Sequence, residues 1–160
     1  MTQYLKLRGI TYESIQDYKK THLYLAFPNC TFKCKNCQNK EMIKLPIIKI
    51  SIEKLIKKYI KNKITEAIVM GGLEPFYDED SFLVIKDLVI QFRQKTKDDI
   101  VIYTGFYYNE IRYWIDQLAL YENIYIKFGR YLPDSEEKYD SVLGVKLASS
   151  NQYGVKISYI

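Results

Sequence analysis

Hydrophobic positions along this chain form short continuous runs, separated by stretches in which they recur every three or four residues. The first four runs end next to a proline, a glycine or a Thr-Gly pair. Short apolar runs bounded by turn residues are typical of buried β-strands. We therefore predict strands over residues 22–27, 66–70, 100–103 and 124–128, and a further strand in the last segment over residues 142–147.

The stretches between the runs have helical periodicity. After Ser51, apolar residues recur at positions 52, 55, 56, 59 and 60, and lysines occupy the other face. This spacing predicts an amphipathic helix with Ser51 as its N-cap, because a serine side chain accepts a hydrogen bond from a free N–H of the first turn. Similar spacing predicts a long helix from about residue 80 and another near residues 110–121.

Strands and helices thus alternate along the chain, which predicts an α/β fold with mostly parallel strands and crossover helices. In parallel α/β folds the ligand site lies beyond the carboxyl ends of the strands. The predicted strand ends carry Cys30, Gly71-Gly72, Thr104-Gly105 and Gly129. We therefore expect these residues to meet at one edge of the sheet.

The length of 160 residues predicts a single domain over residues 1–160. No apolar run approaches the roughly 18 residues of a membrane span, and residues 1–6 lack the apolar core of a signal peptide, so a cytoplasmic location without a membrane partner is expected. The net charge is +5, but the 24 Lys and Arg are interspersed with 19 acidic residues. This pattern predicts a solvated surface and no direct nucleic-acid partner.

All cysteines of the chain lie within eight residues, as Cys30, Cys34 and Cys37 in a C-x-x-x-C-x-x-C pattern. A tight loop can direct three thiolates at one 4Fe-4S cluster, and three protein ligands leave the fourth iron open to bind a substrate. One alternative is a structural zinc site, which needs a fourth ligand; the only histidine is His22. The other is a disulfide, which the reducing cytosol disfavours.

This cysteine pattern after the first strand resembles the hallmark of the radical S-adenosylmethionine superfamily. The segment Gly71-Gly72-Leu73-Glu74-Pro75 is similar to the superfamily's Gly-Gly-Glu-Pro type motif, with Leu73 as an additional residue. The resemblance implies that Gly71, Gly72 and Glu74 contact S-adenosylmethionine. It also implies that an electron from the cluster cleaves the sulfonium C–S bond and releases a 5'-deoxyadenosyl radical.

Further segments resemble the activating proteins of anaerobic ribonucleoside-triphosphate reductases. They are Cys37-Gln38-Asn39, residues 103–106, residues 129–131 and residues 149–152. The stretch 15–20 departs from the Gly-Pro-Gly-x-Arg sequence that these relatives usually carry. The resemblance covers residues 22–153 and implies a single radical S-adenosylmethionine domain, folded as a small incomplete (β/α) barrel. It places Asn36 and Gln38 against the nucleoside.

The function implied by this resemblance is that of an oxidoreductase that generates a glycyl radical on an anaerobic ribonucleotide reductase. Reduced flavodoxin or a similar protein would supply the electron. The cofactors would be the 4Fe-4S cluster and S-adenosylmethionine, with no catalytic side chain beyond the cluster ligands. Two alternatives stay open: a radical enzyme for another glycyl-radical protein or a small molecule, and a metal-binding module without catalysis.

Overall fold

The computed structural model describes residues 3–30, 32 and 40–158. Within these residues the main sheet has six strands in the spatial order β10-β7-β6-β5-β3-β2. The four central strands are parallel to one another, and β2 and β10 pair antiparallel with them at the two edges. The six strands are β2 (Gly9–Ser14), β3 (His22–Phe27), β5 (Ala67–Gly72), β6 (Asp99–Tyr103), β7 (Ile124–Phe128) and β10 (Tyr153–Lys156).

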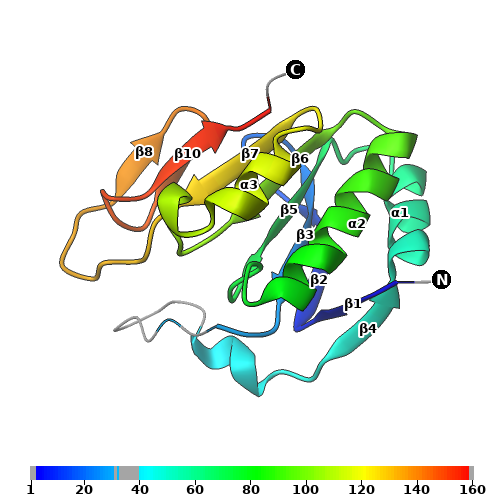
Figure 1. Cartoon of the computed structure of the whole chain (residues 1–160), viewed down its shortest axis with the longest axis horizontal. Helices are drawn as coiled ribbons and strands as arrows, with labels where there is room; N and C mark the ends of the chain where they lie inside the picture. Colours follow the sequence, from blue (N-terminus) through cyan, green and yellow to red (C-terminus); the bar gives the residue numbers. More distant parts are fainter. Residues whose placement is uncertain (1–2, 31, 33–39, 159–160) are drawn as a thin grey trace.

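The three α-helices of the described residues cover one face of this sheet (Figure 1). They are α1 (Ile52–Lys61), α2 (Glu79–Lys95) and α3 (Arg112–Leu118). Ile68 and Met70 of β5 pack into the larger hydrophobic core together with buried residues of all three helices. Ala67 and Val69 point to the opposite face, where a second core contains Tyr18 and Leu143. The period-two alternation of side chains along a strand divides the two cores.

Two smaller antiparallel ribbons accompany the main sheet in the described residues. One pairs β1 (Tyr4–Leu7) with β4 (Ile48–Ser51), and the other pairs β8 (Lys138–Asp140) with β9 (Val145–Leu147). Two short 3-10 helices, η1 (Lys40–Lys44) and η2 (Tyr108–Glu110), precede β4 and α3. The β8–β9 hairpin supplies Leu143, Val145 and Leu147 to the second core, so it covers part of the sheet face without helices.

The prediction of a small incomplete (β/α) barrel is wrong. The main sheet is open and mixed, because its edge strands β2 and β10 lie at opposite ends of the strand order and both run antiparallel to their neighbours. A barrel requires a sheet that curls until its edges approach, with a helix following each strand. Here only three parallel steps, β3–β5, β5–β6 and β6–β7, have crossover connections.

The helix predicted after Ser51 is confirmed, since Ser51 Oγ accepts a 3.1 Å hydrogen bond from the Lys54 N–H. In α2 the N-cap is Asp78, whose carboxylate accepts a hydrogen bond from the Ser81 N–H. The strand predicted over residues 142–147 is only partly present. Residues 141–144 form a turn, in which Gly144 adopts φ +73°, and only the last three residues form β9.

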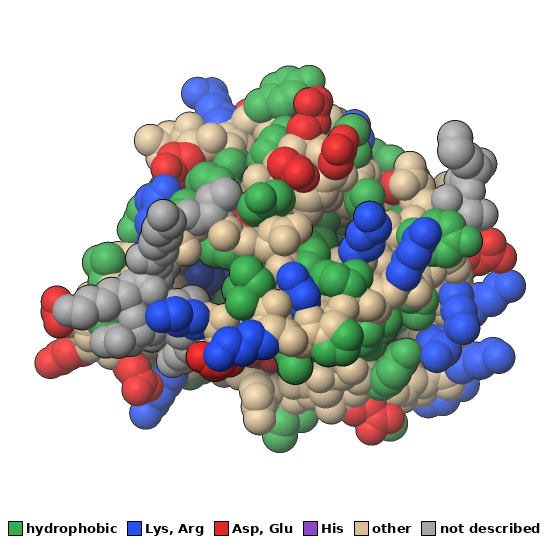
Figure 2. Space-filling model, turned by 90° about the horizontal axis from the view of Figure 1, so that it is seen from below, with side chains coloured by type: hydrophobic (Ala, Val, Ile, Leu, Met, Phe, Trp, Pro, Cys, Tyr) green, Lys and Arg blue, Asp and Glu red, His purple; other side chains and the backbone are tan. Residues whose placement is uncertain are grey.

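Exposed aliphatic residues follow the cysteine loop along the chain. In and after η1, Ile43, Leu45, Ile47 and Ile48 are all at least 39% exposed. Figure 2 shows such hydrophobic side chains interspersed with lysines and arginines on the lower side of the molecule. No helix of the described part of the chain has the length and apolar character needed to cross a lipid bilayer.

Candidate iron–sulfur and ligand site

A cavity of about 430 Å³ lies at the carboxyl ends of the parallel strands, as the alternating pattern predicts. Its wall includes Cys30 after β3, Gly72 at the end of β5, Thr104 and Gly105 after β6, and Gly129 after β7. The volume falls within the roughly 300–1,000 Å³ typical of small-molecule sites. These strand ends converge because parallel neighbouring strands all end on the same edge of the sheet.

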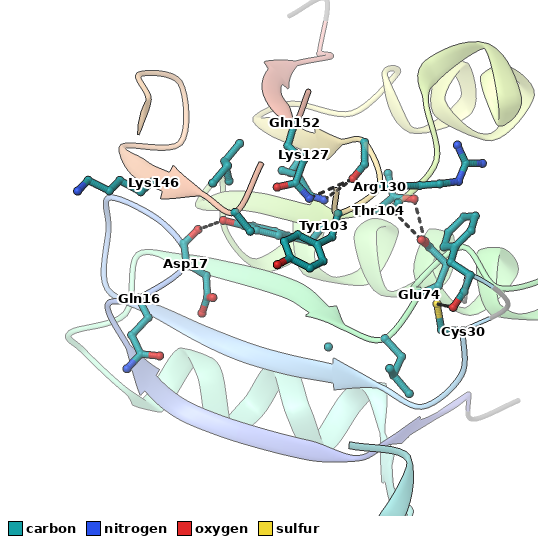
Figure 3. Close-up of a pocket in the computed structure, with 18 of the residues that line it drawn as sticks. Gln16, Asp17, Cys30, Glu74, Tyr103, Thr104, Lys127, Arg130, Lys146 and Gln152 are labelled. Atoms are coloured by element: carbon teal, nitrogen blue, oxygen red, sulfur yellow. Dashed lines mark hydrogen bonds between the residues drawn. The ribbon is translucent and has the colours of Figure 1, made fainter. Parts of the chain in front are cut away.

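The cavity extends over the sheet face that the helices leave free (Figure 3). Tyr24, Tyr103 and Lys127 line it from β3, β6 and β7, and strand neighbours of each pack into the core on the opposite, helix-covered face. Gln16 and Asp17, from the segment between β2 and β3, form another part of the wall. Tyr103 donates a hydrogen bond of 2.5 Å from its hydroxyl to the Asp17 carbonyl, which holds this wall against β6.

Cys30 lies at one end of this cavity, close to Glu74 (Figure 3). The backbone explains this proximity, because the Glu74 N–H donates a 2.7 Å hydrogen bond to the carbonyl of Asn29. Cys30 is partly buried, and its Sγ makes a long 3.8 Å contact with the Phe32 carbonyl. Cys34 and Cys37, like Asn36 and Gln38, lie outside the described residues, so their predicted roles stay predictions.

The Gly-Gly segment is shaped by close backbone packing. Gly72 has φ +81°, and a Cβ on it would lie 2.8 Å from the Ala26 Cα of β3. Only glycine adopts this conformation without strain and permits this approach. Gly71 lies inside β5 beneath Tyr24, whose hydroxyl would be 2.8 Å from an added Cβ. Gly72 therefore reaches the cavity wall, whereas Gly71 is not among the lining residues.

Glu74 is buried, and protein donors occupy both of its carboxylate oxygens. Oε1 accepts the N–H of Gly105 at 2.7 Å. Oε2 accepts the N–H of Phe76 at 2.9 Å and the hydroxyl of Thr104 at 2.8 Å. Burial raises the pKa of Glu74, while these hydrogen bonds and the charge of Lys127 act in the opposite direction. The carboxylate thus joins the loops after β5 and β6, and its predicted contact with S-adenosylmethionine stays a prediction.

Lys127 is a buried cation in the cavity wall. Its Nζ donates a 2.9 Å hydrogen bond to the carbonyl of Gly129 and lies 5.6 Å from the ring centroid of Tyr103. Arg130 and Lys146 also line the cavity, as do the carboxylates of Asp17 and Glu137. A cavity with groups of both charges suits a ligand that itself carries both charges, since each ion of the ligand then finds a partner.

Sequence reasoning did not name several residues of this wall as ligand contacts. The strand pattern places Thr104 and Gly105 at this edge of the sheet without assigning them a ligand contact, Arg130 lies in a segment noted only for its resemblance, and Lys127 is not singled out at all. A signal for Lys127 existed, because it is the only charged residue inside the apolar run of β7. A charged residue within a buried strand is rare unless it has a partner or a function.

His22 does not reach this end of the sheet. It lies fully buried at the amino end of β3, with Nδ1 2.8 Å from the Lys20 carbonyl and Nε2 3.3 Å from Asp17 Oδ2. A strand of this length spans about 16 Å, and Cys30 lies beyond its other end. His22 therefore cannot complete a zinc site with Cys30. In the described part of the chain, no group of three or more His, Cys, Asp or Glu side chains is arranged to hold a metal ion.

Without His22, the candidate metal ligands are the cysteines alone. Thiolates are the usual ligands of iron–sulfur clusters, and Cys30 lies in the wall of a cavity, so this set of ligands suits such a cluster. No curated protein matches the chain. The model of a family described as a 4Fe-4S single cluster domain matches residues 19–153, which include all three cysteines and every strand of the main sheet except β2 and the last residues of β10. This match, which covers most of the chain, supports the binding of a 4Fe-4S cluster, and the chain therefore belongs to the 4Fe-4S single cluster domain family.

Proposed function

We propose that this protein is a radical S-adenosylmethionine enzyme that generates a glycyl radical on an anaerobic ribonucleotide reductase. One observation carries the proposal: the first cysteine of the cluster loop opens into a cavity of small-molecule size, beside the Gly-Gly-Leu-Glu segment. In a passive cluster module there is no need for such a cavity next to the cysteines. An enzyme that binds a second small molecule at the cluster requires one.

Cys30, Cys34 and Cys37 would hold the cluster and leave one iron without a protein ligand. When bound there and reduced, the cluster supplies the electron that cleaves the sulfonium C–S bond of S-adenosylmethionine. The chain's own residues bind and orient the ligand. Gly72 brings unshielded backbone to the wall next to Cys30, and the Tyr24 and Tyr103 rings form an aromatic surface away from the helices. Holding the reactants in register in this way is the main contribution of a protein to cofactor chemistry.

The charges around the cavity support S-adenosylmethionine as the ligand. Its amino acid end carries an ammonium and a carboxylate, and its sulfonium carries a positive charge. The wall offers the Lys127 ammonium and the Arg130 guanidinium as partners for an anion, and the Asp17 and Glu137 carboxylates as partners for cations. Asn36 and Gln38 would lie against the nucleoside, as the resemblance implies.

The reductase as protein substrate is supported by three sequence segments that resemble the activating proteins. Residues 103–106, 129–131 and 149–152 are far apart in the chain, yet Tyr103, Arg130 and Gln152 line the same cavity. Gln152 donates a 3.2 Å hydrogen bond to the Gly129 carbonyl, which connects two of the three segments directly. Similarity concentrated in one cavity is expected when relatives share the ligand that the cavity holds.

Reduced flavodoxin, or a similar acidic carrier, is the proposed electron donor. The support is an exposed strip that begins three residues after Cys37. There, Ile43 and Ile47 are exposed, and Lys40 and Lys44 lie in the same segment. Exposed apolar residues accompanied by lysines are typical of surfaces that bind an acidic partner, and this strip follows the last cysteine closely in the sequence.

The first test measures cleavage of S-adenosylmethionine. Protein reconstituted with iron and sulfide under anaerobic conditions should form 5'-deoxyadenosine when S-adenosylmethionine and dithionite are added. Cys34→Ala should lose the brown colour and the cleavage together. Ser141→Ala, in the exposed turn of the β8–β9 hairpin, serves as a control of similar size and should keep both. Product formation by Cys34→Ala would contradict the ligand assignment, and a wild-type protein with a cluster but no product would contradict the enzyme assignment.

The second test concerns the protein substrate. The reconstituted protein is incubated with S-adenosylmethionine, a reductant and an anaerobic ribonucleotide reductase, and a glycyl radical is sought by electron paramagnetic resonance. A radical on the reductase that depends on this protein supports the proposal. Formation of 5'-deoxyadenosine without a glycyl radical would show cleavage with a different substrate.

A further inference from the structure

Phe32 is the one described residue between Cys30 and Cys34, and its ring contacts two segments distant in sequence. It packs edge-on against Phe106, with ring centroids 4.7 Å apart and an interplanar angle of 69°. The guanidinium of Arg130 lies 4.7 Å from the centroid of the same ring. The contact with Phe106 is favourable because the edge of one ring faces the surface of the other. The contact with Arg130 is favourable because a cation faces the π-surface of the ring.

Gly105 completes this contact by having no side chain. A Cβ on Gly105 would lie 2.7 Å from Phe32 Cε2 and 2.8 Å from Phe32 Cδ2. Real Cβ atoms do not approach other atoms this closely, so the ring lies in space that only glycine leaves open. Gly105 is not among the glycines with positive φ. The requirement for glycine here therefore comes from the ring and not from the backbone conformation.

The position of Arg130 is itself held by neighbours. Its Nη2 lies 2.6 Å from Glu110 Oε2, and the other oxygen of Glu110 accepts a 2.9 Å hydrogen bond from the Tyr107 N–H. The guanidinium also lies 5.5 Å from the Tyr107 ring. Gly105 is held too, because its N–H donates to the buried Glu74 carboxylate. Gly105 and Arg130, which contact the Phe32 ring, are thus themselves hydrogen-bonded at the carboxyl edge of the sheet.

We propose that Phe32 is a positioning residue for the cluster. Its ring occupies a notch formed by Gly105, Phe106 and Arg130, here called the Phe32 seat, and thereby fixes the cysteine loop against the ends of β6 and β7. An aromatic anchor between the first two cysteines restricts the loop before the cluster binds. The loop therefore loses less conformational entropy when the thiolates bind iron. This inference depends on the cluster that the family assignment establishes, and not on cleavage of S-adenosylmethionine.

The test measures how fast the cluster is lost. Wild-type, Gly105→Ala and Gly9→Ala proteins are reconstituted anaerobically, and iron release to an excess of chelator is followed by the decay of the cluster absorbance. Gly9→Ala is the matched control, since its added Cβ would meet only the Ala26 Cβ at 3.9 Å, an ordinary contact. We expect Gly105→Ala to release iron roughly tenfold faster than the other two, the size expected when ring contacts of this kind are lost.

Two further variants distinguish positioning from a general loss of stability. Phe32→Ala removes the ring and adds no atoms, so it should also release iron faster even if Gly105→Ala does not fold. The double variant Gly105→Ala with Phe32→Ala should release iron no faster than Phe32→Ala alone, because the added methyl group then has no ring to displace. Chemical unfolding of the apo-proteins should show little difference between Phe32→Ala and wild type.

The electron paramagnetic resonance spectrum of the reduced cluster provides an independent signature. Displacement of the loop should change the g-values in Gly105→Ala and in Phe32→Ala, but not in Gly9→Ala. The proposal is overturned if Phe32→Ala retains its iron and its spectrum like wild type. It is also overturned if the effects of the Gly105 and Phe32 substitutions simply add, since two residues in one seat must be coupled.

Discussion

Thr104 donates its hydroxyl hydrogen to the buried carboxylate of Glu74 at 2.8 Å. Thr104 follows β6 and Glu74 follows β5, so this bond joins two neighbouring strand ends in the wall of the cavity. The N–H of Gly105 adds a second bond to the same carboxylate. One acidic side chain therefore joins the ends of β5 and β6 at the edge of the sheet that carries Cys30.

Glu74→Gln should destabilise the protein, because an amide has only one acceptor oxygen. The NH₂ group of the glutamine would face either the N–H of Gly105 or both the N–H of Phe76 and the hydroxyl of Thr104, and these groups are donors too. A buried donor left without an acceptor costs about 1–3 kcal/mol, and we expect a loss of this size in the unfolding free energy at neutral pH. Urea denaturation measures it. Glu137→Gln, at an exposed position on the cavity wall, is the control and should change stability little.

A comparison of wild type with Glu74→Gln at several pH values tests the pKa of Glu74, which burial raises above its ordinary value of 4.5. The folded state then holds the proton more tightly than the unfolded state. The resulting stabilisation is complete below pH 4.5 and is lost as the pH rises through the raised pKa. The stability advantage of wild type over Glu74→Gln should therefore shrink with rising pH in this window. An advantage that grows with pH would show that the hydrogen bonds outweigh burial.

Lys127→Met should raise the pKa of Glu74 further. The positive charge of Lys127 acts to lower this pKa, so replacing it with a neutral side chain of similar length removes that effect. Carboxyl ¹³C NMR titration of Glu74 measures the change. Lys146→Met removes a charge from an exposed position on the same cavity wall and should leave the titration as in wild type. Equal titration curves for Lys127→Met and wild type would refute the coupling.

Gly72→Ala should destabilise the fold and perturb the cavity together. The positive φ of Gly72 disfavours a side chain by about 1–2 kcal/mol, and the 2.8 Å approach to the Ala26 backbone adds strain. We expect a loss of at least this size in chemical unfolding. Gly9→Ala is the control, because Gly9 is not among the residues of positive φ and its Cβ would meet only an ordinary contact. A Gly72→Ala protein as stable as Gly9→Ala would contradict this account.

Tyr18→Phe should weaken the attachment of the segment that carries Gln16 and Asp17. The buried Tyr18 hydroxyl donates a 2.7 Å hydrogen bond to Asp99 at the start of β6, which Lys20 also contacts. Hydrogen bonds to charged groups contribute about 1.5–3 kcal/mol, so urea unfolding should show a loss in that range.

The matched control for this substitution is Tyr12→Phe. Tyr12 is 41% exposed and only accepts a surface hydrogen bond from Lys58, so its loss should change stability by less than about 0.5 kcal/mol. Equal stabilities of the two variants would mean that the bond between Tyr18 and Asp99 contributes little.

Local sequence patterns predicted much of the central sheet. The runs at residues 22–27 and 124–128 coincide with β3 and β7, and Ser51 caps α1 as its position before the periodic apolar residues indicates. These features leave a local signal, since an apolar run between turn residues and a serine before a periodic segment can both be recognised from residues close in sequence. The convergence of Cys30 with Gly72 at one sheet edge followed from the same alternation.

Which strands pair was decided only by the tertiary structure. β10 pairs with β7 and β2 pairs with β3, both antiparallel. Because these two strands form separate edges, the sheet is an open layer and not a barrel. Apolar and polar residues alternate in β1 and in β4, but this pattern does not indicate that the two strands pair with each other. Pairing depends on the energy of a whole interface between segments far apart in the chain, and no local pattern encodes that energy.

The cysteine spacing by itself indicated an iron–sulfur cluster, because three cysteines within eight residues can reach one cluster, but it left a zinc site or a disulfide open. The chain could not by itself indicate that Lys127 faces a cavity, that the Glu74 carboxylate is occupied by protein donors, or that Phe32 lies against Gly105. Each of these depends on which face of a strand or loop meets which neighbour. That is set by long-range packing, where the burial of one side chain depends on the positions of all the others.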